Sequence, residues 1–225
     1  MIKVENIETF GLYGAMRGMR NPLNSWDKAD TTVYQGHDKE FVNIGVNDLN
    51  LATRLIKAGT EHRKFLRMIH MQMDVTAPLY WWKEADTYKV GTTANSCSTM
   101  HKIAAKEFTL DDFSHDHLFN DAVVYNGYVP TSVLECVIGA LNEFRNLYLE
   151  TKDKQYWWQM IQLLPSSYNQ RRTWDMSMET LLSILHQRKN HKLDEWNEFR
   201  DICLEQVPYL KEFYEASLKE TTNEN

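Results

Sequence analysis

The chain has 225 residues, with 31 acidic against 25 basic side chains and a formal net charge of −6. This length can bury a full core, and we expect one domain over residues 1–220 with a frayed tail at 221–225. The acidic excess argues against general nucleic-acid binding, because proteins that bind polyanions usually carry a basic excess. Three scattered cysteines and the lack of an apolar run of ~18 residues predict a cytoplasmic protein without a membrane partner.

The first sixty residues predict short elements separated by a long polar segment. Asn47 and Asp48 are residue types that cap helices, and the apolar spacing after them predicts a helix that stops at Gly59. The polar segment is expected to be irregular and to cover a site or a subunit interface. The other elements predicted here are a strand at 2–10, a turn or short helix at 11–20, the irregular segment at 23–46 and a short helix at 60–66.

In the middle of the chain, apolar and polar residues alternate with a period of two over residues 69–75, which predicts a strand with one buried face. Pro78 fits the first turn of a following helix to about Tyr88, with Leu79, Trp82 and Ala85 on its apolar face. Residues 91–100 are rich in glycine, threonine and serine and predict a loop.

The second half is mostly helical. Ser132 and Glu135 have capping-box spacing at the start of a long amphipathic helix, and Ser177 is placed to cap a later one. The whole pattern predicts an α+β fold, with a small, mostly antiparallel sheet packed with helices. The other elements are a short helix from Thr109, helices at 155–164, 193–206 and 209–219, a strand at 171–176, and the helix that Ser177 caps and that carries Arg188.

Several polar groups have both a functional and a structural interpretation. Arg188 can donate two parallel bonds to a carbonyl–imide edge or a phosphate, or it can simply complement a helix C-terminus. The loop 91–101 can hold phosphate through backbone N–H groups, or it can be an ordinary connection. Cys97 is weak evidence for a nucleophile, and no metal site is expected because the histidine pairs 115/117 and 186/191 lack suitable spacing and further ligands. The triplets Tyr80-Trp81-Trp82 and Tyr156-Trp157-Trp158 can stack on a flavin, but such residues are more often core or interface.

Two regions together resemble the flavin-dependent thymidylate synthases. In that family a "KxG" helix end precedes a strand, an "AP" and a helix leading to the signature RHRxxSxNExSxRY; later come an "LP", a strand, a helix ending in "LxxR" and a "QWEI". The resemblance covers roughly residues 45–102 and 160–210. The matching pieces are Lys57-Ala-Gly59, the strand at 69–75, Ala77-Pro78 and the loop to His101, then Leu164-Pro165, Thr173–Ser177, Leu185-His-Gln-Arg188 and Glu195-Trp196.

The resemblance implies the fold of the thymidylate synthase-complementing proteins and a homotetramer. It also implies FAD as cofactor, NADPH as reductant, methylenetetrahydrofolate as one-carbon donor and dUMP or a related pyrimidine nucleotide as substrate. The family arginine that polarises the uracil ring maps onto Arg188, which is therefore the expected catalytic and base-binding residue. The chemistry would rest on the flavin and on positioning.

The signature itself is altered. Its RHR triplet falls on Thr87-Tyr88-Lys89, its phosphate arginine on Met100, and its flavin-contacting asparagine and arginine on Ser177 and Glu179. We expect Lys89, Asn95 and Ser177 to contact the cofactor and Ser98 the substrate, with Arg171 and Arg172 as compensating charges. Two alternatives remain: a catalytically silent nucleotide-binding or oligomeric scaffold of the same fold, and a helical interaction protein without a ligand.

Overall fold

The computed structural model describes residues 2–37, 40–121 and 127–218, so the predicted tail at 221–225 lies outside the described residues. Internal contacts divide the chain into two compact units. The first comprises Met1–Lys3, Val75–Thr87 and Asn95–Arg172; the second comprises Val4–Asp74, Tyr88–Ala94 and Thr173–Asn225. Each unit is described by itself. In the described residues, no helix is both long enough and apolar enough to span a bilayer.

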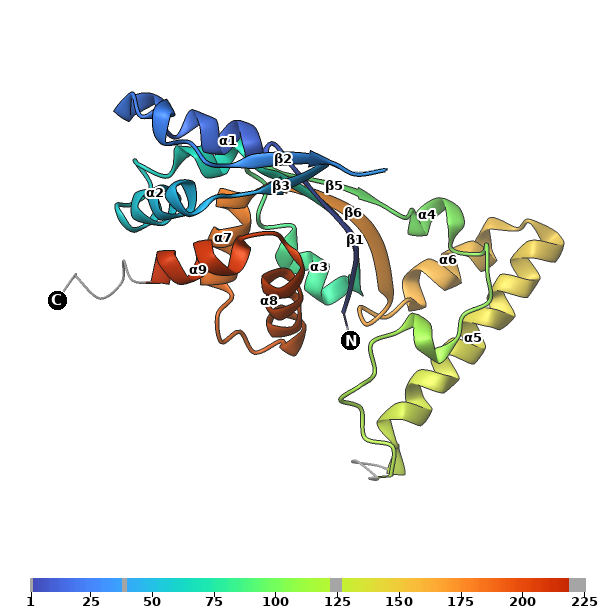
Figure 1. Ribbon diagram of the computed structural model, residues 1–225. Helices are drawn as coiled ribbons and strands as arrows, with labels where there is room; N and C mark the ends of the chain where they lie inside the picture. Colours follow the sequence, from blue (N-terminus) through green and yellow to red (C-terminus); the bar gives the residue numbers. More distant parts are fainter. Residues whose placement is uncertain (1, 38–39, 122–126, 219–225) are drawn as a thin grey trace. The chain divides into compact units, whose positions relative to one another are not determined.

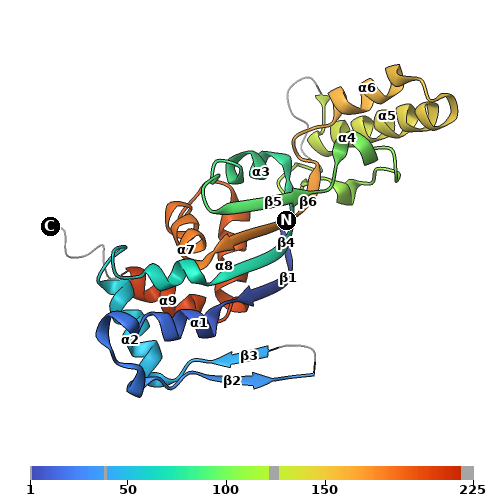
Figure 2. The same ribbon diagram turned by 90° about the horizontal axis from the view of Figure 1, so that it is seen from above.

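The main sheet has four strands in the order β1-β4-β6-β5 (Figure 2). Two backbone bonds flank the β4–β6 pair: Leu79 N–H donates to Tyr168 O (3.0 Å) and Met178 N–H to Ile69 O (2.8 Å). Because each bond joins the end of one strand to the start of the other, the pair is antiparallel. The α+β class with a small antiparallel sheet packed with helices is confirmed. The strands are β1 (Lys3–Phe10), β4 (His70–Pro78), β6 (Asn169–Ser177) and β5 (Thr92–Ser96).

The second unit contains most of the shorter helices and a separate hairpin. Its core includes Phe65, Ile69 and Phe213, all at most 4% exposed. Phe65 and Phe213 meet edge to face with ring centroids 6.2 Å apart. Its helices are α1 (Leu12–Gly18), α2 (Val46–Lys57), α7 (Met178–Gln187), α8 (Asp194–Gln206) and α9 (Leu210–Leu218), with short 3-10 turns at Asn21–Leu23, Trp26–Lys28 and Lys64–Met68.

The segment 23–46 is not irregular as the sequence predicted. It contains β2 (Thr32–Gln35) and β3 (Glu40–Asn43), which form an antiparallel two-stranded sheet (Figure 2). Tyr34 and Phe41 are directly opposite each other in this sheet, and both are exposed. The strands were missed because four-residue strands with exposed aromatic side chains give no buried alternation for a sequence pattern to register.

The start of α2 also corrects a prediction. Its N-cap is Gly45, and the Asp30 carboxylate accepts from Asn47 N–H (2.8 Å) and Asp48 N–H (2.9 Å). Asp48 is itself only 1% exposed and pairs with Arg20 at 2.5 Å. The helix is therefore capped by the carboxylate of Asp30, seventeen residues before Asn47. A local sequence pattern cannot predict such a distant partner. The short helix predicted at 60–66 is instead the 3-10 turn Lys64–Met68.

Strand β4 is confirmed and runs three residues further than predicted, to Pro78. Pro78 is the N-cap of α3 (Leu79–Ala85) and adopts extended backbone, so it precedes the first helical turn instead of lying in it. The buried face of α3 is formed by Trp81, Trp82 and Ala85, whereas Leu79 is only partly buried. The indole N–H of Trp82 donates to Gln170 O (2.8 Å), which satisfies its polar atom in the core.

The first unit is built around the long helix α5 (Pro130–Thr151) and α6 (Lys154–Leu163), which pack side by side (Figure 1). The 3-10 turn Leu110–Asp112 carries the capping box of Thr109 with Asp112, in line with the short helix predicted there. The box predicted for Ser132 and Glu135 is wrong. Pro130 begins α5, since a residue without N–H suits the first helical position, and the N-cap is Val129.

Candidate functional site

The segment predicted as a loop at 91–101 is an edge strand followed by a short helix. Strand β5 pairs with β6, and Cys97 N–H donates to Arg171 O (3.0 Å) just beyond its end. Ser98 then caps α4 (Thr99–Lys102) by accepting from His101 N–H (3.1 Å). An edge strand buries little of its surface, so β5 needs no alternating apolar residues and resembles a polar loop in sequence.

At the other end of β5, Gly91 lies against the first turn of α7. Gly91 has φ +77°, and a Cβ there would lie 3.0 Å from Thr180 Oγ1. Thr180 N–H in turn donates to Ser177 Oγ (3.2 Å), so the predicted cap at Ser177 is confirmed. A glycine is favoured at this position for two reasons: its left-handed backbone and the close approach to the Thr180 side chain.

Arg188 is the C-cap residue of α7 and contacts two aromatic rings. Its guanidinium carbon is 5.3 Å from the centroid of the Tyr88 ring and 4.9 Å from that of the Trp196 ring. Its Nε donates to the Tyr88 hydroxyl oxygen at 2.8 Å. Both ring contacts are within the range of cation–π attraction, which holds the planar cation more firmly than a helix end alone would.

Trp196 is a rigid part of this arrangement because it belongs to the core. It is 1% exposed and packs edge to face against Phe199, with ring centroids 6.0 Å apart. The Phe199 ring in turn packs against the Trp174 ring, with centroids 5.9 Å apart, and the His191 and Trp196 ring centroids are 6.4 Å apart. Arg188 therefore rests on a buried aromatic stack that begins in β6 and α8. We define Arg188, Tyr88 and Trp196 as the arginine clamp.

An ion pair occupies the first turn of α7. Glu179 carries the acid there, and the Arg63 Nε lies 3.1 Å from its carboxylate, with both side chains less than one fifth exposed. An acid in the first turn is favourable with the positive end of the helix dipole. The sequence suggested only the loss of an arginine at position 179; the structure supplies an arginine to the same turn from the segment before Lys64–Met68.

Arg171 and Arg172 differ in their surroundings. Arg171 is exposed. Arg172 is 14% exposed: its guanidinium lies 4.3 Å from the Trp82 ring, its Nη1 is 2.7 Å from Asp86, and its Nε donates to Gln170 Oε1 (3.0 Å). Gln170 Nε2 donates to Cys97 O (2.7 Å), so the same network holds the chain between β5 and α4. The guanidinium of Arg172 is therefore already engaged by Asp86, Trp82 and Gln170.

The predicted site residues fall into two groups, one in each unit. The arginine clamp, Lys89 and Ser177 belong to the second unit, where Lys89 lies between the clamp residue Tyr88 and Gly91. The first unit carries the rest, which surround the β5–α4 junction and the start of β6. These are Asn95, Ser98, Arg171 and Arg172. Sequence reasoning missed Tyr88 and Trp196 as partners of Arg188, although both lie within the quoted motif regions.

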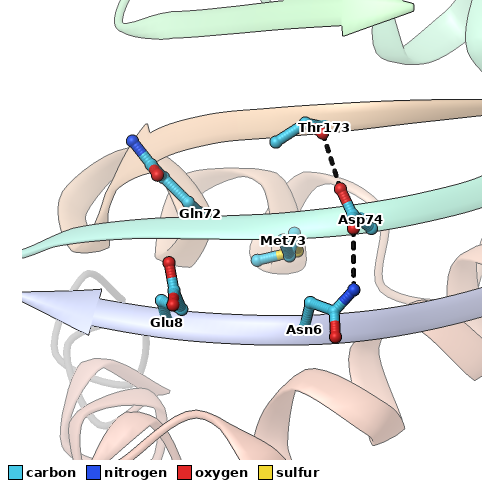
Figure 3. Close-up of a pocket in the computed structure, with 6 residues that line it drawn as sticks. All are labelled: Asn6, Glu8, Gln72, Met73, Asp74 and Thr173. Carbon is cyan, nitrogen blue, oxygen red and sulfur yellow. Dashed lines mark hydrogen bonds between the residues drawn. The ribbon is translucent and has the colours of Figure 1, made fainter. Parts of the chain in front are cut away.

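The described residues also form a polar pocket on the sheet. It has a volume of about 270 Å³ and lies over β1, β4 and β6 (Figure 3). Asp74 is fixed there by Asn6 Nδ2 (2.8 Å) and Thr173 Oγ1 (2.6 Å). Asn6 has φ +51°, a conformation that asparagine tolerates. None of the predicted site residues lines this pocket, which is completed by Glu8, Gln72 and Met73.

The aromatic triplets, Cys97 and the histidine pairs were the remaining candidates. Trp81 and Trp82 are core, whereas Trp158 is 43% exposed on α6. Cys97 is exposed and lies in the β5–α4 connection. Across the described ranges of the chain, no group of three or more His, Cys, Asp or Glu side chains has the geometry of a metal site.

Comparison with solved structures gives a fold match over nearly the whole chain. Thymidylate synthase X (ThyX) from Helicobacter pylori, solved with FAD and dUMP, is 16% identical with a TM-score of 0.66, over 96% of this chain and 99% of that chain. A second structure of this enzyme with FAD and dUMP is 15% identical with a TM-score of 0.64, over 96% and 98% of the two chains. The UMP/dUMP methylase PolB from Streptomyces cacaoi, bound with 5-Br dUMP, is 14% identical with a TM-score of 0.62, over 96% and 94%.

No protein-family model and no curated protein sequence matches the chain. The similarity to solved structures is therefore a similarity of fold, and it covers 96% of this chain.

Proposed function

We propose that this protein is a divergent flavin-dependent thymidylate synthase-like enzyme, which methylates dUMP or a related pyrimidine nucleotide. The observation that carries the proposal is the arginine clamp: Arg188, the residue that the motif comparison assigns to the pyrimidine, is held by Tyr88 and Trp196. The solved structures of similar fold contain FAD with dUMP, or 5-Br dUMP, and so support the same ligand class.

Arg188 is proposed to bind the base edge. A guanidinium donates several hydrogen bonds in one plane, so it favours a ring edge with carbonyl acceptors and would stabilise negative charge that develops on the pyrimidine. Arg171 and Ser98 are proposed to contact the nucleotide phosphate, with Arg172 as a nearby positive charge. Ser98 and Arg171 lie on segments joined by the Cys97–Arg171 backbone bond.

FAD is the proposed cofactor, and it would supply the hydride that converts the transferred one-carbon unit into a methyl group. Two of the first N–H groups of α7 are already bonded, Met178 N–H to Ile69 O and Thr180 N–H to Ser177 Oγ, so the proposal of FAD rests on the family resemblance and on Lys89 as a positive charge two residues before Gly91. Lys89, Asn95 and Ser177 are the proposed contacts. Ser177 would act from its position in the helix cap, where its hydroxyl already accepts from Thr180 N–H.

Three further parts of the proposal rest on the family resemblance: NADPH as the reductant, methylenetetrahydrofolate as the one-carbon donor and a homotetrameric assembly. A single folded domain over residues 1–220 and a cytoplasmic location are proposed from the length and composition of the sequence. The test of the activity is methylation of dUMP by the purified protein with FAD, NADPH and methylenetetrahydrofolate, followed as formation of dTMP. Formation of dTMP that Arg188→Ala abolishes would support the proposal. Absence of dTMP from protein that binds FAD and dUMP would contradict turnover.

One observation favours a second candidate, a nucleotide-binding scaffold without turnover. Glu179 and Arg63 neutralise each other at the turn where the related enzymes are expected to carry a flavin-contacting arginine. A scaffold of this kind would bind dUMP through Arg188 and would be colourless after purification, because it would retain no flavin.

A further inference from the structure

We infer that Tyr88 is a positioning residue for Arg188, and that it sets the affinity of the site for a pyrimidine nucleotide. This inference rests on the proposed function, since it assigns the ligand of Arg188 as that function does. Tyr88 stands where the motif comparison places the central histidine of the family signature. It is therefore a feature of this chain and not of the signature.

Tyr88 contacts Arg188 directly through its hydroxyl group. Tyr88 lies just beyond α3, a hundred residues before Arg188, and its hydroxyl oxygen accepts from Arg188 Nε at 2.8 Å. A hydrogen bond to a charged group is among the stronger ones in proteins. Since Nε is the atom nearest the aliphatic stem, a bond there restrains the final torsions of the side chain and so the plane of the guanidinium.

The rings of Tyr88 and Trp196 both contact the guanidinium of Arg188. The guanidinium carbon lies 5.3 Å from the Tyr88 centroid and 4.9 Å from the Trp196 centroid, and the two rings meet at an interplanar angle of 73°. Trp196 is buried in the core, whereas Tyr88 is only half-buried and reaches the arginine from the chain between α3 and β5. Trp196 thus contacts the cation from the core, and Tyr88 holds its Nε.

The restraint on Arg188 affects ligand binding. An arginine side chain has many rotamers, and a ligand that must immobilise it loses affinity through the lost conformational entropy. A guanidinium whose Nε is already held by a hydrogen bond has less of this freedom to lose when a carbonyl acceptor binds. Tyr88 therefore acts through Arg188 and needs no contact with the nucleotide.

The experiment is a double-mutant cycle on the dissociation constant of dUMP, with the FAD-saturated protein. Tyr88→Phe keeps the ring and removes only the hydroxyl, and Tyr34→Phe, in the exposed hairpin, is the matched control. We expect Tyr88→Phe to weaken dUMP binding about tenfold, or 1.4 kcal/mol. In an Arg188→Ala background the same substitution should leave the dissociation constant of dUMP unchanged. Tyr34→Phe should leave it unchanged in both backgrounds. A purely structural tyrosine would lower affinity equally in both backgrounds.

An unchanged dUMP dissociation constant in Tyr88→Phe, or an equal loss with and without Arg188, would overturn the inference and leave the proposed function intact. The same cycle is measured on the free energy of unfolding without ligand. Coupling there between Tyr88→Phe and Arg188→Ala supports the contact independently of the nucleotide. A wild-type protein that shows this coupling but binds no dUMP would overturn the proposed function, and with it the nucleotide role assigned to Tyr88.

Discussion

The guanidinium of Arg188 rests on Trp196, with 4.9 Å between the guanidinium carbon and the ring centroid. Because Trp196 is almost completely buried and continues through Phe199 to Trp174, the position of the cation depends on the packing of α8 against β6. A residue proposed for chemistry is thus held by the hydrophobic core, as preorganised sites require.

The shape of Arg188 matters as well as its charge. Arg188→Lys keeps a positive charge but loses the planar fork and its stacking on Trp196. We expect both Arg188→Lys and Arg188→Ala to lower dTMP formation by about a hundredfold or more, on the scale of a lost transition-state donor. Bound FAD should stay at the wild-type level, as measured by absorbance after desalting. Lys192→Ala, at an exposed position, serves as the control. If the Arg188→Lys variant formed dTMP at nearly the wild-type rate, the planar shape of the guanidinium would have no role.

The buried pair of Arg20 and Asp48 should dominate the stability of the second unit. Their side chains are 3% and 1% exposed, and the Asp48 carboxylate also accepts from Thr31 Oγ1 (2.5 Å) and Thr31 N–H (2.8 Å). Asp48→Ala leaves a buried arginine without its carboxylate, which costs about 3–5 kcal/mol. Urea unfolding would measure this against the exposed Asp27→Ala, and a loss below 1 kcal/mol would show that the pair is not the anchor of α2.

Acid should weaken the fold through the same carboxylate. Burial of Asp48 opposes its ionisation, but bonds from Thr31, Arg20 and the Asp30 N–H outweigh that effect and lower its pKa from 3.8. A lowered folded-state pKa means that the stabilisation is complete above the unfolded-state pKa and is lost as pH falls below about 4 through the folded-state value. Unfolding free energy measured from pH 6 to pH 2.5 should fall steeply below pH 4 in wild type and less steeply in Asp48→Asn. Equal slopes would contradict this origin.

Adjacent arginines in β6 should have separable effects. Arg172→Ala removes the stacking on Trp82 and the pairing with Asp86, and we expect it to lower the unfolding free energy by about 1–3 kcal/mol. Arg171→Ala, at an exposed position, should leave stability within about 0.5 kcal/mol. It should instead weaken dUMP binding in a salt-dependent manner, as a screened phosphate contact would. The reverse assignment of the two effects would remove Arg171 from the nucleotide site.

The three thiols should react in two classes. Cys97 and Cys136 are exposed, whereas Cys203 is fully buried in α8 and burial raises the pKa of its thiol. A thiol without thiolate or access reacts slowly. A thiol-specific chromophoric reagent should therefore label two cysteines in the folded protein and the third only after unfolding. Fast labelling of all three would contradict the packing of α8.

Elements with strong periodicity were predictable from sequence. The alternating apolar residues of β4 and the Ser177 cap of α7 are local signals, and the structure follows both. Elements defined by distant partners were not predictable. Strand β5 is recognisable only by its pairing with β6, and the cap of α2 comes from Asp30, outside the helix. A local pattern carries no information about either partner.

The candidate site follows the same division. Arg188 was identified because a motif and a helix end coincide on it. Tyr88 lies a hundred residues earlier in the chain, and sequence spacing gives no sign that its hydroxyl accepts a hydrogen bond from Arg188 Nε. The ion pair of Arg172 with Asp86 and its contact with the Trp82 ring likewise cannot be predicted from sequence spacing.

The most direct test of the central claim is the visible absorption spectrum of the freshly purified protein, repeated after FAD is added and excess is removed by desalting. The account predicts bands near ~370 and ~450 nm, the usual signature of a bound oxidised flavin, that shift when dUMP is added. A protein that stays colourless after FAD is added and removed would contradict the proposal of a flavoenzyme, and the fold would then mark ancestry alone.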